Sequence, residues 1–444
     1  MKKIVLAAAA TVTALTLSAE GYQINTLSAK QGGMGHTGVA QKLGAESMFF
    51  NPAGVAFMDS LMDISASVTG IKAIADATVK NPDSSSASYR THNGMSTPVA
   101  AGAAFRIYDK LKAGVMFYTP YGSAINWTDN WPGAVLNQSV DLKTYSIQPT
   151  FSYKILDNLS IGAGLMLTWG SVDLNKGLVP ASSMDAMLDQ MQVPGYRFGQ
   201  TTPASVNLNG TTSLALGFNV GVMWDISSKV TVGASYRSKM NMKVDAGNAS
   251  ITYANELARQ LLQSRLDVLN QANFKAQMPC PEVWLAGVSY RPIKGLTLAL
   301  DVQLTGWRAY KNLDIEFLDP HLTPYDQHLK KDYKDAWTFH VGAQYALTSR
   351  FDIRAGLMVD TTPVNSDYYN PETPGTTKIE PSAGFSFRPV RNFSIDFSFM
   401  YVAGLKRSDT KCPYTDLLLG AERTFNADYT VKAFCPSLGL SYRF

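Results

Sequence analysis

Apolar and polar residues alternate along most of the chain after about residue 60. The alternation is clearest from 158 to 170, where large or aliphatic residues occupy every second position and mostly small or polar residues lie between them. Stretches 351–360 and 393–401 show the same period of two. Such a period predicts β-strands with one apolar face and one polar face. Fourteen segments of this kind can be placed before the C-terminus.

The connections between these segments alternate between very short and long. The short ones fall near 108–110, 156–158, 227–229, 292–295, 348–350 and 389–392. The long ones fall near 76–88, 128–138, 174–210, 249–274, 316–334, 365–376 and 407–427. Short turns at one end and long loops at the other are typical of an outer-membrane β-barrel with an even number of strands, whose short turns face the periplasm.

The two faces of the strands favour a barrel in lipid over a soluble β-protein. A secreted β-sandwich also has alternating strands, and periodicity cannot separate a buried face from a lipid-facing one. Fourteen apolar outer faces, however, would leave a soluble protein with too much apolar surface to cover. We therefore predict an all-β fold, a 14-stranded antiparallel transmembrane β-barrel formed by residues 60–444.

The N-terminus has the features of a secretory signal peptide. Lys2 and Lys3 precede an apolar run, 4–17, that is too short to span a membrane. Ala19 is a small residue suited to cleavage, and Ser18 is an alternative. We predict that residues 1–19 are removed and that the mature chain resides in the outer membrane of a Gram-negative bacterium.

The composition excludes several other classes of protein. Charged residues make up 17% of the chain, and the mean hydropathy is −0.06. A polytopic helical membrane protein would have a clearly positive mean hydropathy, and a disordered or nucleic-acid-binding chain would carry more charge. Without the two signal-peptide lysines the formal net charge of +4 drops to about +2. No nucleic-acid partner is therefore expected.

The chain has three cysteines, Cys280, Cys412 and Cys435, which are too few for a disulfide scaffold and have no metal-binding spacing. In an exported protein they allow one disulfide that staples a loop, and Cys412 with Cys435 is our candidate pair. Three unpaired thiols are equally compatible with the sequence. Neither a metal nor a cofactor is expected.

Two of the long loops have helical patterns. Residues 254–272 place leucines, among them Leu261 and Leu262, on one side of a helix, and 184–191 does the same with Met187 and its neighbours. An apolar helical face on an exposed loop must cover another surface. That surface is either an apolar ligand, which these three residues would contact, or the other loop helix. The two possibilities are compatible with each other.

Residues 20–59 do not show the strand pattern. Gly33, Gly35 and Gly38 match the dinucleotide-binding fingerprint by letter, but no strand precedes them and no βαβ unit surrounds them. A nucleotide site is therefore not expected. The small residues instead favour a segment that folds compactly inside a larger structure.

The segment from 21 to 58 resembles the N-terminal hatch of FadL-type outer-membrane transporters of long-chain fatty acids and other hydrophobic compounds. Its Asn51-Pro52-Ala53-Gly54 motif lies where that family has Asn-Pro-Ala. Further similarities lie at 118–127, 281–292, 301–307, 333–337, 354–364 and the final SYRF. The resemblance implies a 14-stranded barrel plugged by residues 20–59, with a kinked third strand that opens the wall sideways into the membrane.

Two residues of the third predicted strand could produce the implied kink. Pro120 and Gly122 fall inside the third predicted strand, where proline removes a donor from the ladder and glycine weakens pairing. An unpaired backbone group in hydrocarbon costs several kcal/mol, so a break there must be shielded or functional. The alternative is that Pro120 lies at the outer rim, where the strand frays.

Alternation predicts which charged residues point into the lumen. They are Arg106, Arg237, Arg354, His340, Asp301, Asp352, Asp360 and Asp396. Paired lumen charges are commonly structural, yet a deep arginine could anchor a carboxylate through both of its oxygens. Arg237, Arg354 and His340 are therefore our candidate ligand-binding residues in the lumen.

The resemblance implies passive uptake of a hydrophobic small molecule, foremost a long-chain fatty acid, and the apolar loop helices and the possible break at Pro120 and Gly122 support it locally. The cargo would bind the helical loops, enter the lumen, pass a hatch that moves near 51–54, and leave past Pro120 and Gly122 into the membrane. The protein would be a monomer surrounded by outer-membrane lipid and lipopolysaccharide, and Phe444 would be the signal read by the barrel assembly machinery.

The alternatives are an aromatic-hydrocarbon transporter of the same fold, a general porin, a structural barrel and an outer-membrane acyl hydrolase. An enzyme is not expected, because the chain has no G-x-S-x-G motif and only His340 among five histidines is predicted to point into the lumen.

Overall fold

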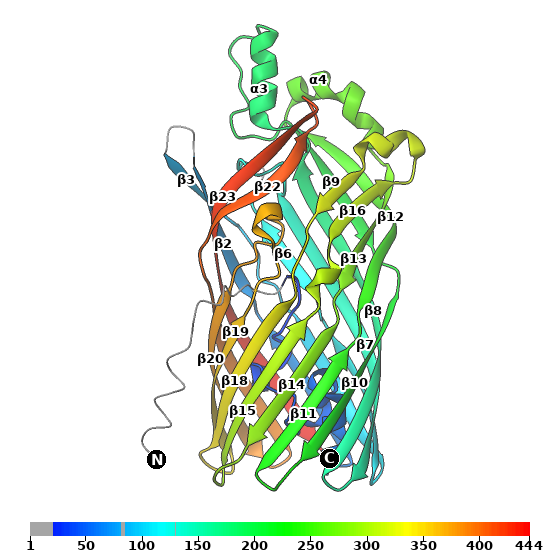
Figure 1. Ribbon diagram of the computed structural model, residues 1–444, viewed down its shortest axis with the longest axis vertical. Helices are drawn as coiled ribbons and strands as arrows, with labels where there is room; N and C mark the ends of the chain where they lie inside the picture. The colour runs from blue at the N-terminus through cyan, green and yellow to red at the C-terminus, as the bar shows by residue number, and fades with distance from the viewer. Residues whose placement is uncertain (1–20, 81–84, 129) are drawn as a thin grey trace.

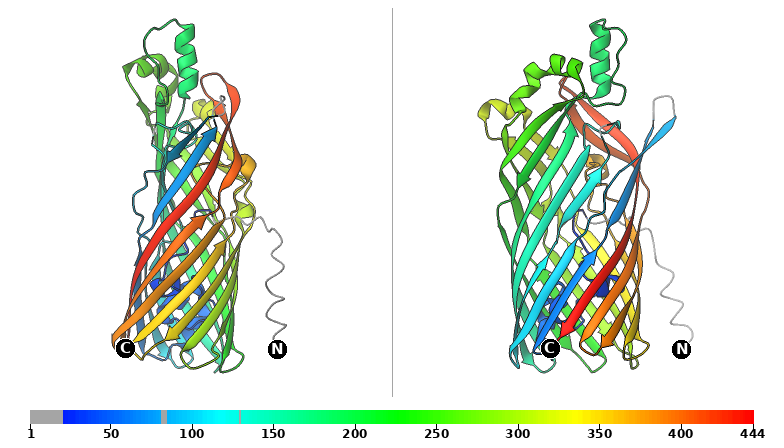
Figure 2. Two further views of the ribbon diagram at one scale, coloured as in Figure 1. Left: turned by 90° about the vertical axis from the view of Figure 1, so that its left-hand side faces the viewer. Right: turned by 180° about the vertical axis from the view of Figure 1, so that it is seen from behind.

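The computed structural model describes residues 21–80, 85–128 and 130–444, and Figures 1 and 2 show it from three sides. Within these residues fourteen strands pair antiparallel in a closed ring, in which the last strand pairs with the first. In ring order they are β1 (Met62–Thr69), β4 (Val99–Tyr108), β5 (Leu111–Tyr118), β7 (Ser139–Leu156), β8 (Leu159–Gly177), β10 (Ala215–Asp225), β11 (Val230–Arg237), β14 (Val283–Tyr290), β15 (Leu296–Thr305), β18 (Ala336–Ala346), β19 (Phe351–Asp360), β20 (Lys378–Val390), β21 (Phe393–Gly404) and β23 (Ala421–Arg443). The predicted fourteen-stranded antiparallel barrel is confirmed.

The alternation along the strands separates an outer face from an inner face. On β8, Ile161 and Leu165 point outward and are 46% and 48% exposed, whereas Met166 is 1% exposed. β19 and β21 alternate in the same way. An outward row of large apolar side chains is what lipid requires of a barrel wall. The six predicted short turns are confirmed, and they gather at one end of the barrel (Figure 1).

The long connections contain more regular structure than the sequence pattern predicts. The wall continues beyond the ring in nine further strands of the described chain: β2 (Lys72–Lys80), β3 (Ser86–Arg90), β6 (Gly122–Asn126), β9 (Ala204–Thr211), β12 (Met240–Tyr253), β13 (Asn273–Cys280), β16 (Asn312–Phe317), β17 (Gln327–Lys330) and β22 (Arg407–Asp416). Several of these strands pair with each other, as β9 does with β12. Strands that lie above the membrane need no lipid-facing row, which explains why alternation alone did not predict them.

Two helices cover the end of the barrel opposite the short turns (Figure 1). They are α3 (Ala181–Gln190) and α4 (Glu256–Leu266), and the turn η3 (Asp267–Leu269) follows the second. Both helical loops were predicted, with bounds that differ by a few residues. Other short 3₁₀ turns are η4 (Trp307–Ala309), η5 (Pro320–Tyr325) and η6 (Ser366–Tyr368). Of the helices in the described ranges, none combines the length and the apolar character needed to cross a membrane.

Residues 21–58, called the hatch from here on, fold inside the barrel near its short-turn end (Figures 1 and 2, dark blue). The hatch consists of the short helices α1 (Ala29–Gly32) and α2 (Ser47–Phe50) and the 3₁₀ turns η1 (Gly44–Glu46) and η2 (Pro52–Phe57). Gly35 has φ +60, and a Cβ atom there would lie 2.6 Å from the backbone oxygen of Val341 on the wall. At this position glycine therefore permits close contact between hatch and wall. The predicted signal peptide lies outside the described residues.

The candidate disulfide between Cys412 and Cys435 is wrong. All three cysteines are buried free thiols. Cys412 on β22 pairs with Phe425 of β23, whereas Cys435 lies ten residues farther along β23 and pairs with Met400 of β21. Ten residues of strand span roughly 33 Å, far beyond the reach of a disulfide.

The free thiols give a direct chemical prediction. Protein purified without reductant and then unfolded should react with three equivalents of a maleimide per chain, because each cysteine is reduced and merely buried. Mass spectrometry of the labelled chain measures the number. One labelled thiol per chain would show that a disulfide forms and would contradict the structure.

Candidate functional site

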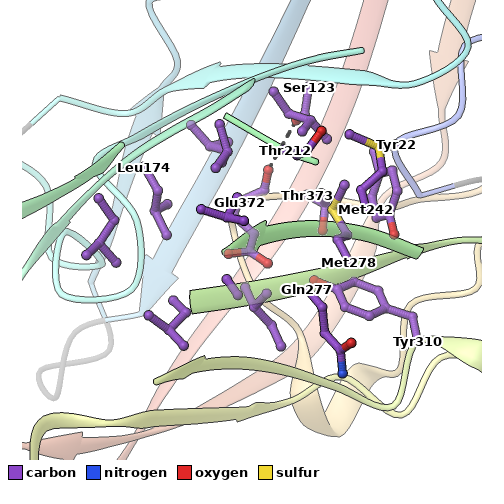
Figure 3. A pocket seen from close by; sticks show the side chains of 18 of the residues that line it. Tyr22, Ser123, Leu174, Thr212, Met242, Gln277, Met278, Tyr310, Glu372 and Thr373 are labelled. Atoms are coloured by element: carbon purple, nitrogen blue, oxygen red, sulfur yellow. Dashed lines mark hydrogen bonds between the residues drawn. The ribbon is translucent and has the colours of Figure 1, made fainter. Parts of the chain in front are cut away.

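A cavity lined mainly by apolar side chains lies inside the barrel between the hatch and the helical loops. Its volume is about 800 Å³, including space open to solvent. Its apolar lining comes from β7, β8, β9, β12, β13 and β16, and includes Leu142, Leu174, Leu208, Met242, Val244, Phe274, Met278 and Ile315 (Figure 3). A lining with so few polar groups favours an apolar or amphipathic molecule.

The polar residues of this cavity are mostly uncharged, and Glu372 is the only ionisable carboxylate among the described lining residues. The Glu372 side chain forms an ion pair with Lys331, whose side chain is 1% exposed. The Lys331 ammonium also lies 6.0 Å from the centre of the Tyr310 ring, which lines the cavity. A buried cation therefore stands directly behind the polar side of the cavity.

A second lysine lies on the outer side of the same carboxylate. Lys176, near the end of β8 and beyond the apolar band of the wall, donates to Oε1 of Gln327 at 2.8 Å. Burial lowers the pKa of Lys176 to about 8; Glu372 acts in the opposite direction, and Lys331 adds to the lowering. Lys176 also lines a groove among the extracellular loops, called the outer groove, which includes Leu178, Leu329 and several polar residues. Two buried lysines thus lie between the outer groove and the cavity, and Glu372 pairs with Lys331 and acts electrostatically on Lys176.

The third strand of the barrel is broken where it reaches the cavity. β5 ends at Tyr118, which pairs with Ser146, and β6 begins at Gly122, which pairs with Lys143. Three residues, 119–121, therefore stand opposite two residues of β7, which is the arrangement of a β-bulge. The neighbouring strand β4 pairs with β5 but not with β6. The break predicted at Pro120 and Gly122 is present, and it lies within the wall.

The first residues of the hatch fill the edge that β4 leaves open. Gln23 forms an antiparallel bridge with Tyr121. The amide of Ile24 donates to the oxygen of Pro120 at 2.9 Å, and the amide of Gly122 donates to the oxygen of Tyr22 at 2.9 Å. Residues 22–24, called the closing segment, thus act as a short strand beside the break. Tyr22 and Ser123 of β6 also line the cavity, so cavity and break are contiguous (Figure 3).

The Asn-Pro-Ala-Gly motif fastens the hatch to the opposite wall. Asn51 is fully buried, and its Nδ2 donates to the oxygens of Val39 and Val222 at 2.8 and 2.9 Å. Its Oδ1 accepts from the amide of Ala53 at 3.1 Å, which caps η2. A Cβ atom on Gly221 of β10 would lie 2.1 Å from that oxygen. Hatch and wall therefore fit each other closely here, and the predicted role of Asn51, Pro52, Ala53 and Gly54 as a gate stays untested.

Two predicted ligand-binding residues bind the hatch in this conformation. Nη2 of Arg237 donates to the oxygen of Phe49 at 3.0 Å, and its guanidinium lies 4.3 Å from the centre of the Phe49 ring. Nδ1 of His340 lies 2.9 Å from the oxygen of Gly35. Neither side chain lines the apolar cavity. Their role toward a ligand stays a prediction.

Arg354, the third predicted lumen residue, lies at the periplasmic side of the hatch. Its Nε donates to Oε1 of Gln344 at 2.8 Å, and its guanidinium lies 3.5 Å from Asp396 and 3.7 Å from Asp352. Alternation thus predicted the direction of this side chain correctly. It faces a different cavity from the apolar one, and its role toward the cargo likewise stays a prediction.

The two loop helices belong to one apolar cluster together with the upper wall. Leu262 of α4 is 2% exposed, and Leu261 and Met187 are partly buried in the same apolar cluster. This cluster also contains Leu174, Leu208 and Phe274 of the cavity lining. A hydrogen bond from Nδ2 of Asn255 to the hydroxyl of Tyr196 joins the two loops. Packing of the two helices on each other stays a prediction, and so does contact of Leu261, Leu262 and Met187 with cargo.

The fold and the site define a plugged outer-membrane β-barrel with an internal apolar cavity. A family model described as outer membrane protein transport protein (OMPP1/FadL/TodX) matches residues 9–444. The chain belongs to this family, whose members are outer-membrane transporters of hydrophobic compounds. The resemblance seen in the hatch residues is thereby confirmed, and so is the outer-membrane location.

Individual relatives are distant but match nearly the whole chain. Outer membrane protein P1 of Haemophilus influenzae is 23% identical, over 89% of this chain and 85% of its own length. The long-chain fatty acid transport protein of Escherichia coli K12 is 22% identical, over 93% and 94%. A FadL homologue from Pseudomonas aeruginosa superimposes with a TM-score of 0.76 at 20% identity, covering 96% of this chain and 100% of its own. The toluene transporter TodX of Pseudomonas putida gives 0.67 at 16% identity, covering 94% and 98%. At such identities the structural matches show a shared fold.

Three parts of the site were missed by sequence reasoning. Lys176 and Lys331 fall in segments without alternation, and the closing segment was treated as part of a uniform hatch. Nothing in the local sequence indicates that a lysine is buried beside a glutamate 41 positions away. Only Gly122 carried a signal for the closing segment, because glycine in a strand often marks a close backbone approach.

The anchoring role of Asn51 can be measured. Asn51→Ala removes three hydrogen bonds, those from Nδ2 to the oxygens of Val39 and Val222 and that from the amide of Ala53 to Oδ1, and each buried group left unpaired costs about 1–3 kcal/mol. We expect hydrogen exchange of the amides in 51–57 to accelerate by about tenfold or more, with the barrel strands unchanged. Asn392→Ala, in an exposed turn, is the control. Unchanged exchange in the hatch of the Asn51 variant would contradict the anchor.

Proposed function

We propose that the chain takes up long-chain fatty acids by passive diffusion and releases them sideways into the membrane. The observation that carries this proposal is the contact between cavity and break, since Tyr22 and Ser123 belong to both. Cargo in the cavity is separated from the surrounding lipid at that point by the closing segment. The proposal requires no cofactor and no catalytic step.

The charge arrangement favours a fatty acid over an aromatic hydrocarbon. A hydrocarbon needs only apolar walls. A cationic group buried near its path costs desolvation energy, and an uncharged cargo forms no ion pair that would offset this cost. Glu372 forms an ion pair with Lys331 and acts electrostatically on Lys176. Asp326 and Glu422 line the outer groove together with Lys176, but among the described residues no carboxylate forms an ion pair with it. A cargo carboxylate would supply the second anion while its alkyl chain lies in the apolar cavity. Toluene is the cargo named for TodX, and an aromatic cargo is therefore the second candidate.

The route begins in the outer groove and ends at the third strand. Cargo would first meet the loops and Lys176, then enter the apolar cavity, and then leave past the break. The closing segment meets the break through one antiparallel bridge of two backbone hydrogen bonds. The Tyr22 side chain is buried, its ring packs against Tyr121, Trp307 and Tyr310, and its hydroxyl donates to the oxygen of Pro279. The rest of the hatch is bonded to the wall at more points. We therefore assign the gate to residues 22–24 and regard the Asn-Pro-Ala-Gly motif as the fixed end of the hatch.

The other classes receive less support. A general porin requires an open water-filled lumen, but here the hatch occupies the lumen at the short-turn end. An acyl hydrolase requires a nucleophile beside its histidine, and no described serine bonds to His340, whose Nδ1 faces the oxygen of Gly35. Recognition of Phe444 by the assembly machinery and a monomeric state remain predictions.

Restoring the third strand should block release. Deleting Pro120 removes the extra residue, so that β5 and β6 can pair with β7 in one register. We expect fatty-acid uptake by cells that carry this variant as their only such transporter to drop by about tenfold or more, with cargo binding by the purified protein retained. Pro120→Val keeps the extra residue and is the matched control. Normal uptake by a folded deletion variant would contradict the sideways exit.

Binding of the carboxylate should depend on pH through Lys176. The pKa of Lys176 is lowered to about 8, so its ammonium is charged at pH 6.5 and mostly neutral at pH 9.5. An anionic cargo favours the charged form, and its affinity should therefore decrease as the pH rises through 8, by roughly five- to tenfold.

Titration calorimetry with a long-chain fatty acid and the alcohol of equal length measures this effect. Lys176→Met should weaken binding of the acid by about tenfold and abolish the pH dependence, whereas binding of the alcohol should change little. Equal pH dependence for acid and alcohol, or for wild type and variant, would contradict the role of Lys176.

A further inference from the structure

A second cavity lies at the periplasmic mouth of the barrel, on the other side of the hatch from the apolar cavity. It is polar, with a volume of about 870 Å³ including space open to solvent. The barrel wall contributes five arginines to its lining: Arg291, Arg354, Arg388, Arg391 and Arg443. The transport route proposed above does not use this cavity.

The hatch contributes two further cations to the same cavity. Lys30 and Lys42 face the wall arginines across the seam between hatch and wall. Gln31, which also lines the cavity, is 1% exposed, and its Oε1 and Nε2 have no hydrogen-bond partner among the described residues. An amide buried without a partner costs free energy, and it adds one acceptor and one donor to the lining.

The carboxylates near these cations do not balance them. None of the described residues that line the cavity is acidic. Behind the lining, Asp63 pairs with Arg443 at 3.0 Å, Asp225 with Lys42 at 2.5 Å, and Asp396 with Arg354 at 3.5 Å. Asp352 pairs with Arg388, and Glu46 interacts with Lys30 and Arg354. Seven cations thus face five anions, an excess of two positive charges.

Two of the arginines account for that excess. Among the described residues no carboxylate forms an ion pair with Arg291 or Arg391, and Nη1 of Arg291 donates only to the hydroxyl of Thr231, at 3.3 Å. Guanidinium groups bind phosphate oxygens in pairs, and several convergent cations favour an anion with more than one charge. Leu43 and Phe393 are the only large apolar residues in the lining, so the cavity offers no place for a lipid tail.

We propose that this cavity binds a multivalent oxyanion of the phosphate type, and that the bound anion joins the hatch to the wall. Cations of both partners line the cavity, so one anion can neutralise Arg291 and Arg391 on the wall and at the same time contact Lys30, Lys42 and the unpartnered amide of Gln31 on the hatch. The bound anion holds the hatch in the plugged position. Its source is a soluble phosphate in the periplasm or the headgroup of an anionic lipid at the rim of the barrel, and the experiment separates the two.

The test uses the full mature chain in phosphatidylcholine nanodiscs. Sodium pyrophosphate is added with the ionic strength kept constant by sodium chloride, and binding is followed by calorimetry and by hydrogen exchange of the amides in 29–46. We expect pyrophosphate to bind and to slow exchange in these residues by at least about fivefold, because bridging restrains the hatch. The double variant Arg291→Gln, Arg391→Gln should weaken binding by about tenfold. Arg350→Gln, in an exposed turn outside the cavity, should bind as the wild type does.

Each of the remaining outcomes either contradicts the proposal or identifies the source of the anion. If nanodiscs with phosphatidylglycerol slow exchange in 29–46 while pyrophosphate does not, and the double variant abolishes this effect, the anion is a lipid headgroup. If neither probe slows exchange, the proposal is wrong. It is equally wrong if chloride alone has the effect of pyrophosphate, since that is ionic screening, or if the double variant binds pyrophosphate as tightly as the Arg350 variant.

Discussion

The need to pair every backbone group in hydrocarbon governs this molecule. A closed ring of fourteen strands satisfies that need along most of the wall. At the third strand one extra residue separates β5 from β6, and β4 does not continue. An open strand edge in lipid would cost several kcal/mol for each unpaired group. Residues 22–24 satisfy this edge from inside the barrel, so the weakest point of the wall is also the point where the hatch and the cavity meet.

The two ends of the hatch differ in how they are bonded to the wall. Its C-terminal part is bound by Asn51 and by polar groups of the wall, such as Ser152 and Ser160, which both bond to the oxygen of Ala53. Its first residues are held at one short edge. Movement of the closing segment would break one backbone bridge and the buried contacts of the Tyr22 ring with Tyr121, Trp307 and Tyr310, whereas movement of the whole hatch would leave many more buried polar groups unpaired. The sideways exit proposed above therefore requires the smaller of the two movements.

Sequence reasoning predicted the features that have a period or a steric signature. Alternation gave the strand number, the short turns and the inward direction of Arg354, and helical spacing gave α3 and α4. Pro120 marked the break because proline cannot donate in a ladder. The extracellular strands, such as β9 and β12, were not predicted because apolar and polar residues need not alternate in strands above the membrane. The burial of Lys176 and Lys331 was not predicted because it depends on contacts between loops that are distant in the sequence. The disulfide prediction was wrong because Cys412 and Cys435 lie at distant points along the strands β22 and β23.

Sideways release past the closing segment is tested most directly by locking that segment in place. Gln23 and Tyr121 form the pair without direct hydrogen bonds between them, at which two strands approach closely enough for a disulfide. The measurement is fatty-acid uptake by cells that carry Gln23→Cys with Tyr121→Cys in a chain whose three native cysteines are serines, under oxidising and reducing conditions. The account predicts that uptake is lost when the disulfide forms and returns when it is reduced, while each single cysteine variant transports under both conditions. Equal uptake by the oxidised and the reduced double variant, with the disulfide verified by mass spectrometry, would contradict it.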